Sequence, residues 1–300
     1  MDLSLRALRY FVITAEEGSI TRAAERLYIS QPSVSSALDQ LERQLGQPLF
    51  VRLPARGVVL TATGAALLYK ARALLDRSDD FIRAAGVTHT TLTGTLRCAC
   101  FVNIAPVYFA HFLHLFNAAH PSVKVKFREL NHDDVLKGIF GGDEEIGMTF
   151  DLGGTAGLDV TELAELRPHA VLSGKHPLAS SSTIRLEQLV DDNLILMDLP
   201  HTRDYFLSLF TRMGLTPKLE HLTTSFEMAR ALAGNDHGYA LLSLTPKSPQ
   251  TYDGHPVVHI PLADPVPPLK IVLLKLRAMP HRKITEVFYT SALQYFRHHV

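Results

Sequence analysis

The sequence has few of the features that mark secreted or membrane proteins. Its 300 residues include two cysteines, Cys98 and Cys100, and its 30 basic and 30 acidic residues give a formal net charge of zero. The longest apolar stretches, near residues 102–116 and 271–276, are too short or too polar to span a bilayer. Arg9 interrupts the early apolar run, so the N-terminus does not predict a signal peptide. We therefore expect a cytoplasmic protein with reduced thiols and no membrane partner.

Patterns for metal binding, cofactors and catalysis are also missing. His111 and His114 share a face of one expected helix, but no H-E-x-x-H pattern or cysteine pair accompanies them. The chain has no P-loop, no G-x-G-x-x-G and no G-x-S-x-G. Residues 141–145 match the motif of nucleotide cyclases only by chance, because they connect a helix to a strand. We assign no metal, no cofactor and no enzymatic activity.

The two cysteines lie two apart in an expected strand. Their Cα atoms would be about 6.5 Å apart with nearly parallel side chains, which is unfavourable for a disulfide. Small buried core residues are the better interpretation, and a thiol switch is the alternative.

Composition and length indicate a globular protein of two domains, or a small domain followed by a larger one split in two. Hydrophobic residues make up 46% of the 300, which is enough for a well-filled core. The first 60 residues are close to neutral, so bulk charge does not by itself indicate nucleic-acid binding.

Residues 19–45 have the pattern of two short helices joined by a tight turn. Ser19 can cap a helix that buries Ala23, Ala24 and Leu27, and Ser30 can cap a second helix. The second helix repeats apolar residues at spacings of three and four and has small polar side chains at its exposed N-terminal end. This is typical of a recognition helix, although an ordinary helical hairpin also fits the two helices alone.

A strand, a turn and a second strand follow. Gly46 ends the helix, residues 48–52 have the apolar character of a strand, and residues 58–60 run back after a turn. A β-wing in this place makes Arg52 and Arg56 available for backbone phosphates. The wing favours a winged helix-turn-helix over a simple hairpin.

At this point the sequence resembles the LysR-type transcriptional regulators. The resemblance is carried, in the family's order and spacing, by Leu8-Arg9-Tyr10-Phe11-Val12, Ser19-Ile20-Thr21-Arg22-Ala23-Ala24, Leu27, Ile29-Ser30-Gln31-Pro32-Ser33-Val34-Ser35, Leu41-Glu42, Leu45-Gly46, Pro48-Leu49-Phe50, Arg52 and Leu60-Thr61. We expect base contacts from Gln31, Pro32, Ser33 and Ser36, and phosphate contacts from Thr21, Arg22, Ser35, Arg52 and Arg56. Many members have Arg directly after the serine that matches Ser35; this chain has Ser36, which removes one such contact.

Residues 63–84 predict one long helix with apolar residues close to a heptad seam, namely Leu67, Ala71, Leu74, Leu75, Phe81 and Ile82. A helix that joins two domains has little intramolecular surface against which to bury such a seam, so we expect dimerisation through it. Packing of the seam onto its own domain is the alternative. Residues 87–94 are rich in threonine and predict a hinge.

From residue 95 onward, the patterns indicate strands over residues 95–101, 123–130 and 146–150 and a helix over residues 104–119. This alternation of strands and helices predicts parallel strands with helical crossovers. Two such sets, joined by crossovers near residues 159–171 and 261–268, are similar to the two-lobe fold of type 2 periplasmic binding proteins, which the family resemblance also implies. The expected domains are a winged helix-turn-helix over 1–61, a linker over 62–90 and an α/β effector domain over 91–300. Lobe I would comprise about 91–161 and 268–300, and lobe II about 162–267.

Ligands of such folds bind beyond the C-terminal ends of strands, near helix N-termini. The loops that meet this description contain Val102, Asn103, Ile104, Thr149, Phe150, His201, Thr202, Arg203, Thr224, Ser225 and Phe226. Free N–H groups, hydroxyls and a basic side chain favour an anion, so we expect a small organic acid, aromatic or aliphatic. Thr202 and Ser225 could instead be simple helix caps, and Arg203 a solvated surface residue.

The sequence thus predicts a DNA-binding transcriptional regulator whose promoter binding changes with a small-molecule effector. Its expected partners are double-stranded promoter DNA, a small organic acid and further copies of the chain in a homodimer or homotetramer, with RNA polymerase as an additional candidate. Two alternatives remain: a regulator whose α/β domain only oligomerises, and a solute-binding protein with an incidental helical N-terminus.

Overall fold

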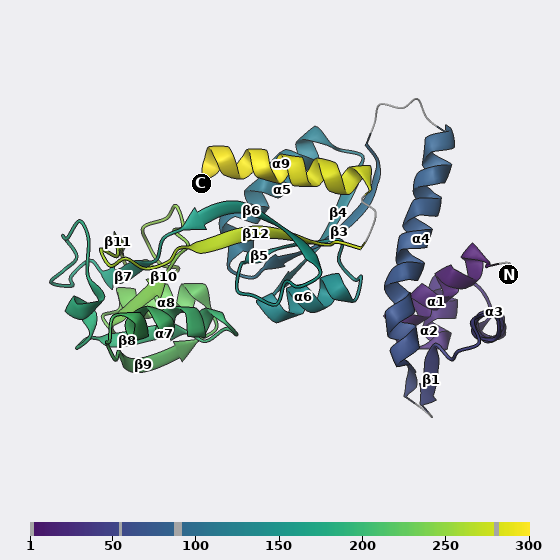
Figure 1. The fold of residues 1–300 in the computed structure, drawn as a ribbon, viewed down its shortest axis with the longest axis horizontal. Helices are drawn as coiled ribbons and strands as arrows, with labels where there is room; N and C mark the ends of the chain where they lie inside the picture. The colour runs from purple at the N-terminus through teal and green to yellow at the C-terminus, as the bar shows by residue number, and fades with distance from the viewer. Residues whose placement is uncertain (1–2, 54–55, 87–91, 279–281) are drawn as a thin grey trace. The chain divides into compact units, whose positions relative to one another are not determined.

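The computed structural model describes residues 3–53, 56–86, 92–278 and 282–300, except the side chains of residues 80 and 83–86. These residues form two compact units (Figure 1). The N-terminal unit is Met1–Gly94 with Gly138–Glu144, and the C-terminal unit is Thr95–Lys137 with Glu145–Val300. Within the described part of the chain, no helix is both long enough and apolar enough to cross a membrane.

The N-terminal unit begins as a winged helix-turn-helix. Its elements are α1 (Leu5–Glu17), α2 (Ile20–Leu27), α3 (Gln31–Leu45), β1 (Phe50–Leu53) and β2 (Gly57–Leu60). The side chains of Ser4, Ser19 and Ser30 cap the three helices by accepting a hydrogen bond from a first-turn N–H. Gly18 and Gly46 end α1 and α3 in the left-handed conformation that glycine adopts at least cost. The N-cap serines and C-cap glycines therefore determine where these helices begin and end.

One hydrophobic core joins the three helices to the wing. Leu8 and Phe11 of α1 and Val34, Leu38 and Leu41 of α3 are buried in it. Leu5, in the first turn of α1, is 46% exposed and does not belong to this core.

The wing is fixed by backbone contacts at both of its ends. The Leu49 and Phe50 N–H groups donate to Glu42 Oε1 at 2.7 and 3.1 Å, and Val58 N–H donates to Gly18 O at 2.9 Å. Gly57 has a φ of +89°, and a Cβ at this position would lie 2.2 Å from Gly18 O. Only glycine allows this approach of the wing to the turn between α1 and α2.

The burial of apolar side chains on helix α4 (Ala62–Gly86) differs between its two halves. Leu68 and Ala71 are buried against the core of the N-terminal unit, so the alternative of packing onto its own domain holds for this part. Leu74, Phe81 and Ile82 are 47%, 77% and 64% exposed. The large apolar side chains that α4 exposes therefore lie in its distal part. Residues 87–91 of the expected hinge lie outside the described residues.

Lobe I of the C-terminal unit is built on a sheet of strand order β4-β3-β5-β12-β6. The strands are β3 (Gly94–Phe101), β4 (Val123–Leu130), β5 (Ile146–Phe150), β6 (Leu158–Leu166) and β12 (Leu269–Leu276). The helices are η1 (Ala105–Phe109), α5 (Ala110–Ala119), α6 (His132–Phe140) and α9 (Lys283–His299). Helices α5 and α9 cover one face of the sheet and α6 the other (Figure 1). Cys98 and Cys100 are buried in β3, and burial raises the pKa of the Cys100 thiol.

Lobe II is built on a second sheet, of order β11-β7-β10-β8-β9. Its strands are β7 (His169–Ser173), β8 (Asn193–Met197), β9 (Lys218–Thr223), β10 (Tyr239–Leu242) and β11 (Val257–Pro261). Its helices are η2 (Leu186–Leu189), α7 (Thr202–Arg212) and α8 (Phe226–Gly234).

Both sheets are mixed, which corrects the expectation of parallel strands. β3 pairs with β5 in parallel, and β8 with β9 and β10, but β12, β7 and β11 run antiparallel to their neighbours. The region expected only as a crossover, residues 159–171, contributes β6 and β7. The expected helix over residues 104–119 begins as a π-helix at η1, which continues into α5.

The chain passes between the lobes twice, from β6 to β7 and from β11 to β12, where β6 and β12 extend toward lobe II (Figure 1). Leu166 and Leu269, at the lobe I ends of these passages, are paired partners in the sheet. Lobe II is thus an insertion whose two ends lie side by side.

Candidate nucleic-acid interface and ligand pocket

The N-terminal end of α3 presents a polar face to solvent. Gln31, Pro32, Ser33 and Ser36 are exposed, because the apolar side of the helix, with Val34, is turned into the core. All the positions at which base contacts were expected are therefore accessible.

The hydroxyl groups of this face are already partly engaged. Ser30 Oγ caps α3 and lies 2.7 Å from Ser33 Oγ. Ser35 Oγ accepts a hydrogen bond of 3.2 Å from Arg52 Nη2, and the same nitrogen lies 2.6 Å from Asp39 Oδ1. Among the described residues, no hydrogen bond is formed by the side chains of Gln31 and Ser36.

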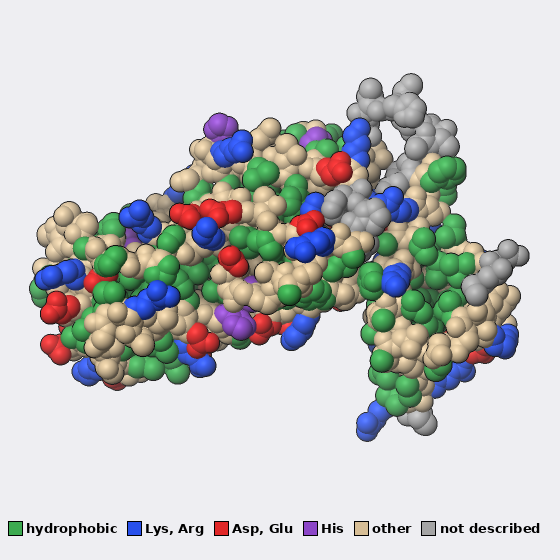
Figure 2. All heavy atoms as spheres, in the orientation of Figure 1, with side chains coloured by type: hydrophobic (Ala, Val, Ile, Leu, Met, Phe, Trp, Pro, Cys, Tyr) green, Lys and Arg blue, Asp and Glu red, His purple; other side chains and the backbone are tan. Residues whose placement is uncertain are grey.

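Three of the residues expected to contact phosphate are exposed in α2 and the wing. Thr21 and Arg22 are exposed in the first turn of α2, and Arg56 is exposed in the wing. Arg22 donates to the Glu17 carbonyl oxygen, which holds its guanidinium beside the N-terminus of α2. Figure 2 shows Lys and Arg side chains at the end of the N-terminal unit where β1 and α3 lie. Tyr28, in the turn before α3, is 95% exposed in a left-handed conformation and was not singled out from the sequence.

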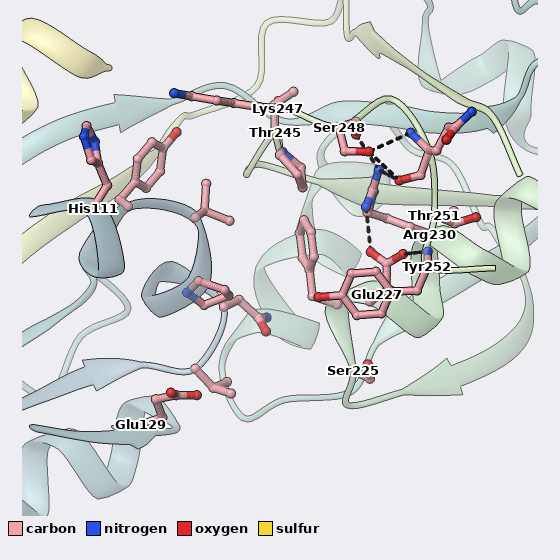
Figure 3. Close-up of a pocket in the computed structure, with 18 of the residues that line it drawn as sticks. His111, Glu129, Ser225, Glu227, Arg230, Thr245, Lys247, Ser248, Thr251 and Tyr252 are labelled. Atoms are coloured by element: carbon pink, nitrogen blue, oxygen red, sulfur yellow. Dashed lines mark hydrogen bonds and ion pairs between the residues drawn. The ribbon is translucent and has the colours of Figure 1, made fainter. Parts of the chain in front are cut away.

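A pocket of about 970 Å³ lies between the two lobes of the C-terminal unit (Figure 3). Lobe I contributes residues that follow β3, together with side chains of η1, α5 and α9. Lobe II contributes the N-terminal end of α8 and the loop over residues 245–252. Its position at the ends of β3 and β9 agrees with the rule that ligands of α/β folds bind beyond strand termini.

The lobe I wall contains a buried amide beside aromatic rings. Asn103 is 7% exposed, and its carboxamide forms no hydrogen bond with any residue that the structure describes. Tyr108 and Tyr295 line the same wall, and burial raises the pKa of both phenols. His111 Nδ1 lies 3.2 Å from Tyr295 Oη, and the ring of His299 stacks on Tyr295 with 4.4 Å between ring centres.

The lobe II wall is held by a buried ion pair. Arg230 is 2% exposed; its Nη1 donates to Glu227 Oε2 at 2.6 Å and its Nη2 to the Ser248 and Gln250 carbonyl oxygens at 2.9 and 3.1 Å. Glu227 Oε1 accepts from Tyr252 N–H at 2.6 Å. These bonds, visible in Figure 3, fix the loop over residues 245–252 to α8.

Two features make this wall suitable for an anion. Ser225 caps α8, and the N–H groups of the first helical turn have no intrahelical acceptors, so they carry partial positive charge. Lys247 is exposed and its side chain extends toward the side of the pocket where His111 lies (Figure 3). Glu227 adds little negative charge because Arg230 neutralises it.

The expected effector residues fall into two groups. Val102, Asn103, Thr224, Ser225 and Phe226 line the pocket. Ile104, Thr149, Phe150 and Thr202 do not line it; their side chains are between 0% and 4% exposed in the interior. Their positions follow from the strand and helix ends to which they belong, where the side chain turns into the core.

His201 and Arg203 also lie outside the pocket lining, because acidic neighbours engage them. His201 Nε2 lies 2.9 Å from Asp133 Oδ1, and Arg203 Nη1 lies 2.9 Å from Asp198 Oδ1. Beside His201, His132 is 1% exposed and is held by Thr149 Oγ1 at 3.1 Å and Gly153 O at 3.0 Å. Burial lowers the pKa of His132.

Sequence reasoning missed Tyr108, Glu129, Arg230, Lys247, Tyr252 and Tyr295, which line the pocket with the expected residues. Arg230 had a usable signal, since Glu227 and Arg230 lie three residues apart in the otherwise apolar Phe226–Gly234 segment and can pair on one helix face. Tyr295 lies far along the chain in α9 and could be placed only by the tertiary fold. Within the described residues, no group of three or more His, Cys, Asp or Glu side chains is arranged to hold a metal ion.

Comparisons with known proteins agree with this architecture. Residues 5–65 match a family described as bacterial regulatory helix-turn-helix protein, lysR family, and residues 89–297 match the LysR substrate binding domain. The uncharacterized HTH-type transcriptional regulator YnfL of Escherichia coli is 34% identical over 223 residues, which cover 72% of this chain and 74% of that protein. The HTH-type transcriptional regulator BenM of Acinetobacter baylyi is 27% identical over 88% of this chain and 86% of its own. The crystal structure of HinK, a LysR family transcriptional regulator from Pseudomonas aeruginosa, superposes with a TM-score of 0.67 at 31% identity, covering 98% of this chain and 99% of that chain.

Proposed function

The chain belongs to the LysR family of transcriptional regulators, and from this premise we propose that a small organic acid bound between its lobes alters how α3 meets promoter DNA. Its DNA-binding and effector-binding domains are those of the family, and its relatives are regulators and not enzymes. The proposal goes beyond family membership in two respects. It specifies the chemical class of the effector, and it assigns the residues that contact the DNA and the effector.

On the DNA side, Gln31 is proposed to be the main base-reading residue. Its amide is exposed at the first position of α3 and is not engaged by any described residue, and a glutamine amide pairs with adenine through two hydrogen bonds. Pro32, Ser33 and Ser36 would line the same groove. Thr21, Arg22 and Arg56 would contact phosphates and set the register. The exposed distal half of α4 would pair two copies, which spaces their α3 helices for two half-sites.

On the effector side, the observation that carries the proposal is the unpaired carboxamide of Asn103. The amide atoms of Asn103 are not among the fully buried, unsatisfied side-chain atoms of the described residues, so they reach the pocket and are available to a ligand. The pocket beside it offers the N-terminus of α8, the Thr224 and Ser225 hydroxyls and the Lys247 ammonium. An anion satisfies these groups together, and the aromatic lobe I wall suits the remaining carbon skeleton.

Calorimetry with the full chain tests the ligand class. We expect at least one member of a panel of aromatic and aliphatic carboxylates, benzoate and hexanoate among them, to bind at least tenfold more tightly than the neutral amide of the same shape. Asn103→Ala should weaken that binding about tenfold, since a hydrogen bond to a charged group contributes about 1.5–3 kcal/mol. Arg203→Ala, a matched change outside the pocket, should leave it unaltered.

Two results would count against the proposal. Equal binding of acids and amides would remove the anion preference. Absence of binding by every panel member, with DNA binding intact, would favour a domain that only oligomerises.

The pocket also suggests how occupancy could reach the DNA. Its walls belong to lobes that only two chain passages connect within the described residues, so a ligand that contacts both walls favours one lobe angle over others. In a dimer, a change of that angle would alter the spacing between the two copies of α3.

A further inference from the structure

The exposed N-terminal half of α3 has no positive charge of its own. Residues 30–37 read Ser-Gln-Pro-Ser-Val-Ser-Ser-Ala, and the first basic residue of the helix is Arg43, beyond its middle. Guanine presents two acceptors, O6 and N7, in the major groove, and a guanidinium fork is their commonest partner. With its own side chains alone, α3 would read adenine well and guanine poorly.

Arg52 of the wing brings a basic side chain to this part of α3. Arg52, in β1, reaches α3 and is held at 2.6 Å by Asp39 Oδ1 and at 3.2 Å by Ser35 Oγ. Ser35 and Asp39 are four residues apart and therefore lie on one face of the helix, adjacent to Ser36. Two anchors on successive turns define the direction of the guanidinium as well as its position.

The remaining donors of Arg52 point to a partner outside the protein. Both contacts use Nη2, whereas Nη1 and Nε meet no acceptor among the described residues. The side chain is 57% exposed. An ion pair this exposed contributes only about 0–1 kcal/mol to stability. Its main effect is therefore to fix the position of the guanidinium.

Charge decides between the two parts of DNA that could accept from these donors. The Asp39 carboxylate neutralises Arg52 and would itself repel a phosphate, so the pair is a poor phosphate site. A base edge is neutral, and the guanidinium keeps its Nη1 and Nε donors while Asp39 and Ser35 engage Nη2. Arg56, which has no such acidic partner in the described structure, is better suited to a phosphate.

We propose that Arg52 is a specificity residue that reads a guanine beside the bases met by Gln31 and Ser36, and that Asp39 positions it. This assignment replaces the phosphate contact expected for Arg52 from its place in the wing. It rests on the proposed entry of α3 into the groove by its N-terminal end.

Selection of binding sites from a randomised duplex pool, followed by sequencing of the bound fraction, tests this assignment in the full chain. Arg52→Lys keeps the positive charge but loses the guanidinium, whose separate nitrogens can contact Asp39 and a base at the same time. It should reduce the preference for guanine at one position of each half-site by about 2- to 12-fold, the range of a single hydrogen bond, because both bidentate edges of a guanidinium include the Nη2 that Asp39 and Ser35 engage. Asp39→Asn keeps the shape but loosens the anchor, and should reduce preference at that same position to a smaller extent. Arg56→Lys, the matched wing control, should leave every base preference unchanged.

The possible outcomes distinguish guanine recognition by Arg52 from the entry of α3 into the groove. If Arg52→Lys and Asp39→Asn weaken all sequences alike, with base preferences intact, Arg52 is a phosphate contact and the inference is wrong. If Gln31→Ala also leaves base preferences unchanged, the placement of α3 in the groove is itself wrong. Arg52→Lys and Asp39→Asn both change side chains that are partly exposed, and each keeps a similar size. A circular dichroism melt confirms that each variant is folded before selection.

Discussion

His201 Nε2 lies 2.9 Å from Asp133 Oδ1 and thereby links the start of α7 in lobe II to the first turn of α6 in lobe I. His201 adopts a φ of 62°, an uncommon conformation for a residue with a side chain. The ring of His132, itself anchored in lobe I, approaches the His201 ring edge-on at 5.4 Å between ring centres. Any change of the angle between the lobes must move or break this contact.

Removal of the link should have a small effect on stability. The side chains of His201 and Asp133 are 46% and 42% exposed, and ion pairs of this kind contribute at most about 1 kcal/mol. We expect Asp133→Ala to lower the free energy of unfolding in urea by less than about 1 kcal/mol. Asp198→Ala, which removes the exposed partner of Arg203, serves as a control with a similar expected loss. A loss above about 2 kcal/mol at Asp133 alone would show that the link holds the lobes together.

The ion pair inside the pocket wall should behave differently. Arg230 is 2% exposed and Glu227 16% exposed. Glu227→Ala leaves a buried guanidinium with carbonyl partners only, and breaking a buried pair in this way costs about 3–5 kcal/mol. Urea unfolding of Glu227→Ala should show a loss of this size, and Glu227→Gln, which keeps an acceptor, a smaller one. Equal losses for Glu227→Ala and Asp133→Ala would contradict the role assigned to burial.

Two histidines should make lobe II sensitive to acid. His259 Nδ1 lies 2.9 Å from His169 Nε2. Burial lowers the pKa of His169 to about 3, with a further contribution from the neighbouring ring, and burial followed by the charge of Arg230 lowers the pKa of His259 to about 4. Both values lie below the unfolded value of about 6.5, so folding favours the neutral rings. Their contribution to stability is complete above pH 6.5 and is lost as the pH falls toward 4.

The histidine pair can be isolated from other titrations by substitution. Each ring that is protonated only in the unfolded chain adds a slope of up to about 1.4 kcal/mol per pH unit. His259→Gln should therefore reduce the slope of unfolding free energy between pH 6 and pH 4.5 by up to this amount. His114→Gln, at an exposed position of α5, should leave the slope unchanged. Unaltered slopes in both variants would show that the pair stays neutral in the unfolded chain or does not titrate in this window.

Loss of a base contact and loss of a phosphate contact should have different effects on DNA binding. Gln31→Ala removes an amide that can pair with adenine, so it should cost about 1–3 kcal/mol on the preferred site and relax preference at that base. Arg56→Ala removes an exposed cation of the wing, so it should weaken all sequences alike and reduce the salt slope by about one. Titrations at several salt concentrations, on specific and random duplexes, measure both. Sequence-selective loss in Arg56→Ala would contradict its assignment to phosphate.

The distal half of α4 should control assembly. Phe81 and Ile82 are 77% and 64% exposed, which is unusual for such side chains unless they meet a partner. A Phe81→Glu substitution places a charge in that contact, and sedimentation should show a shift toward monomer. Phe127→Glu, in β4 of the C-terminal unit, tests whether the effect belongs to α4. An unchanged sedimentation coefficient for Phe81→Glu would exclude α4 as a pairing surface.

The sequence predicts the N-terminal unit well because short-range chemistry determines it. Serine caps at Ser19 and Ser30, Gly46 at the end of α3 and the 3–4 spacing of apolar residues each act within a few positions. The strands β4 and β5 are likewise recovered at their observed bounds from local patterns. Here the local preferences and the tertiary structure agree.

The pocket was harder to predict because it depends on contacts between distant segments. Arg203 had the right charge and a helix start nearby, but Asp198, five residues before it, engages the guanidinium. Arg52 was correctly placed in the wing, yet its contact with Asp39 depends on how the wing folds back on α3. Strand β6 was missed because its polar residues do not alternate regularly: Glu162 and Glu165 are three residues apart, on either side of an irregularity in its pairing with β12. Of these three, the contact of Arg52 depends on a neighbour in another element, which local sequence patterns do not identify.

The paired ends of lobe II, at Leu166 and Leu269, make that lobe a replaceable cassette. A substitute from a relative can enter and leave lobe I at these adjoining positions without rerouting the chain. Diversification of ligand recognition can therefore proceed by exchange or local drift in lobe II, while the helix that meets the operator keeps its own core and its own capping serines.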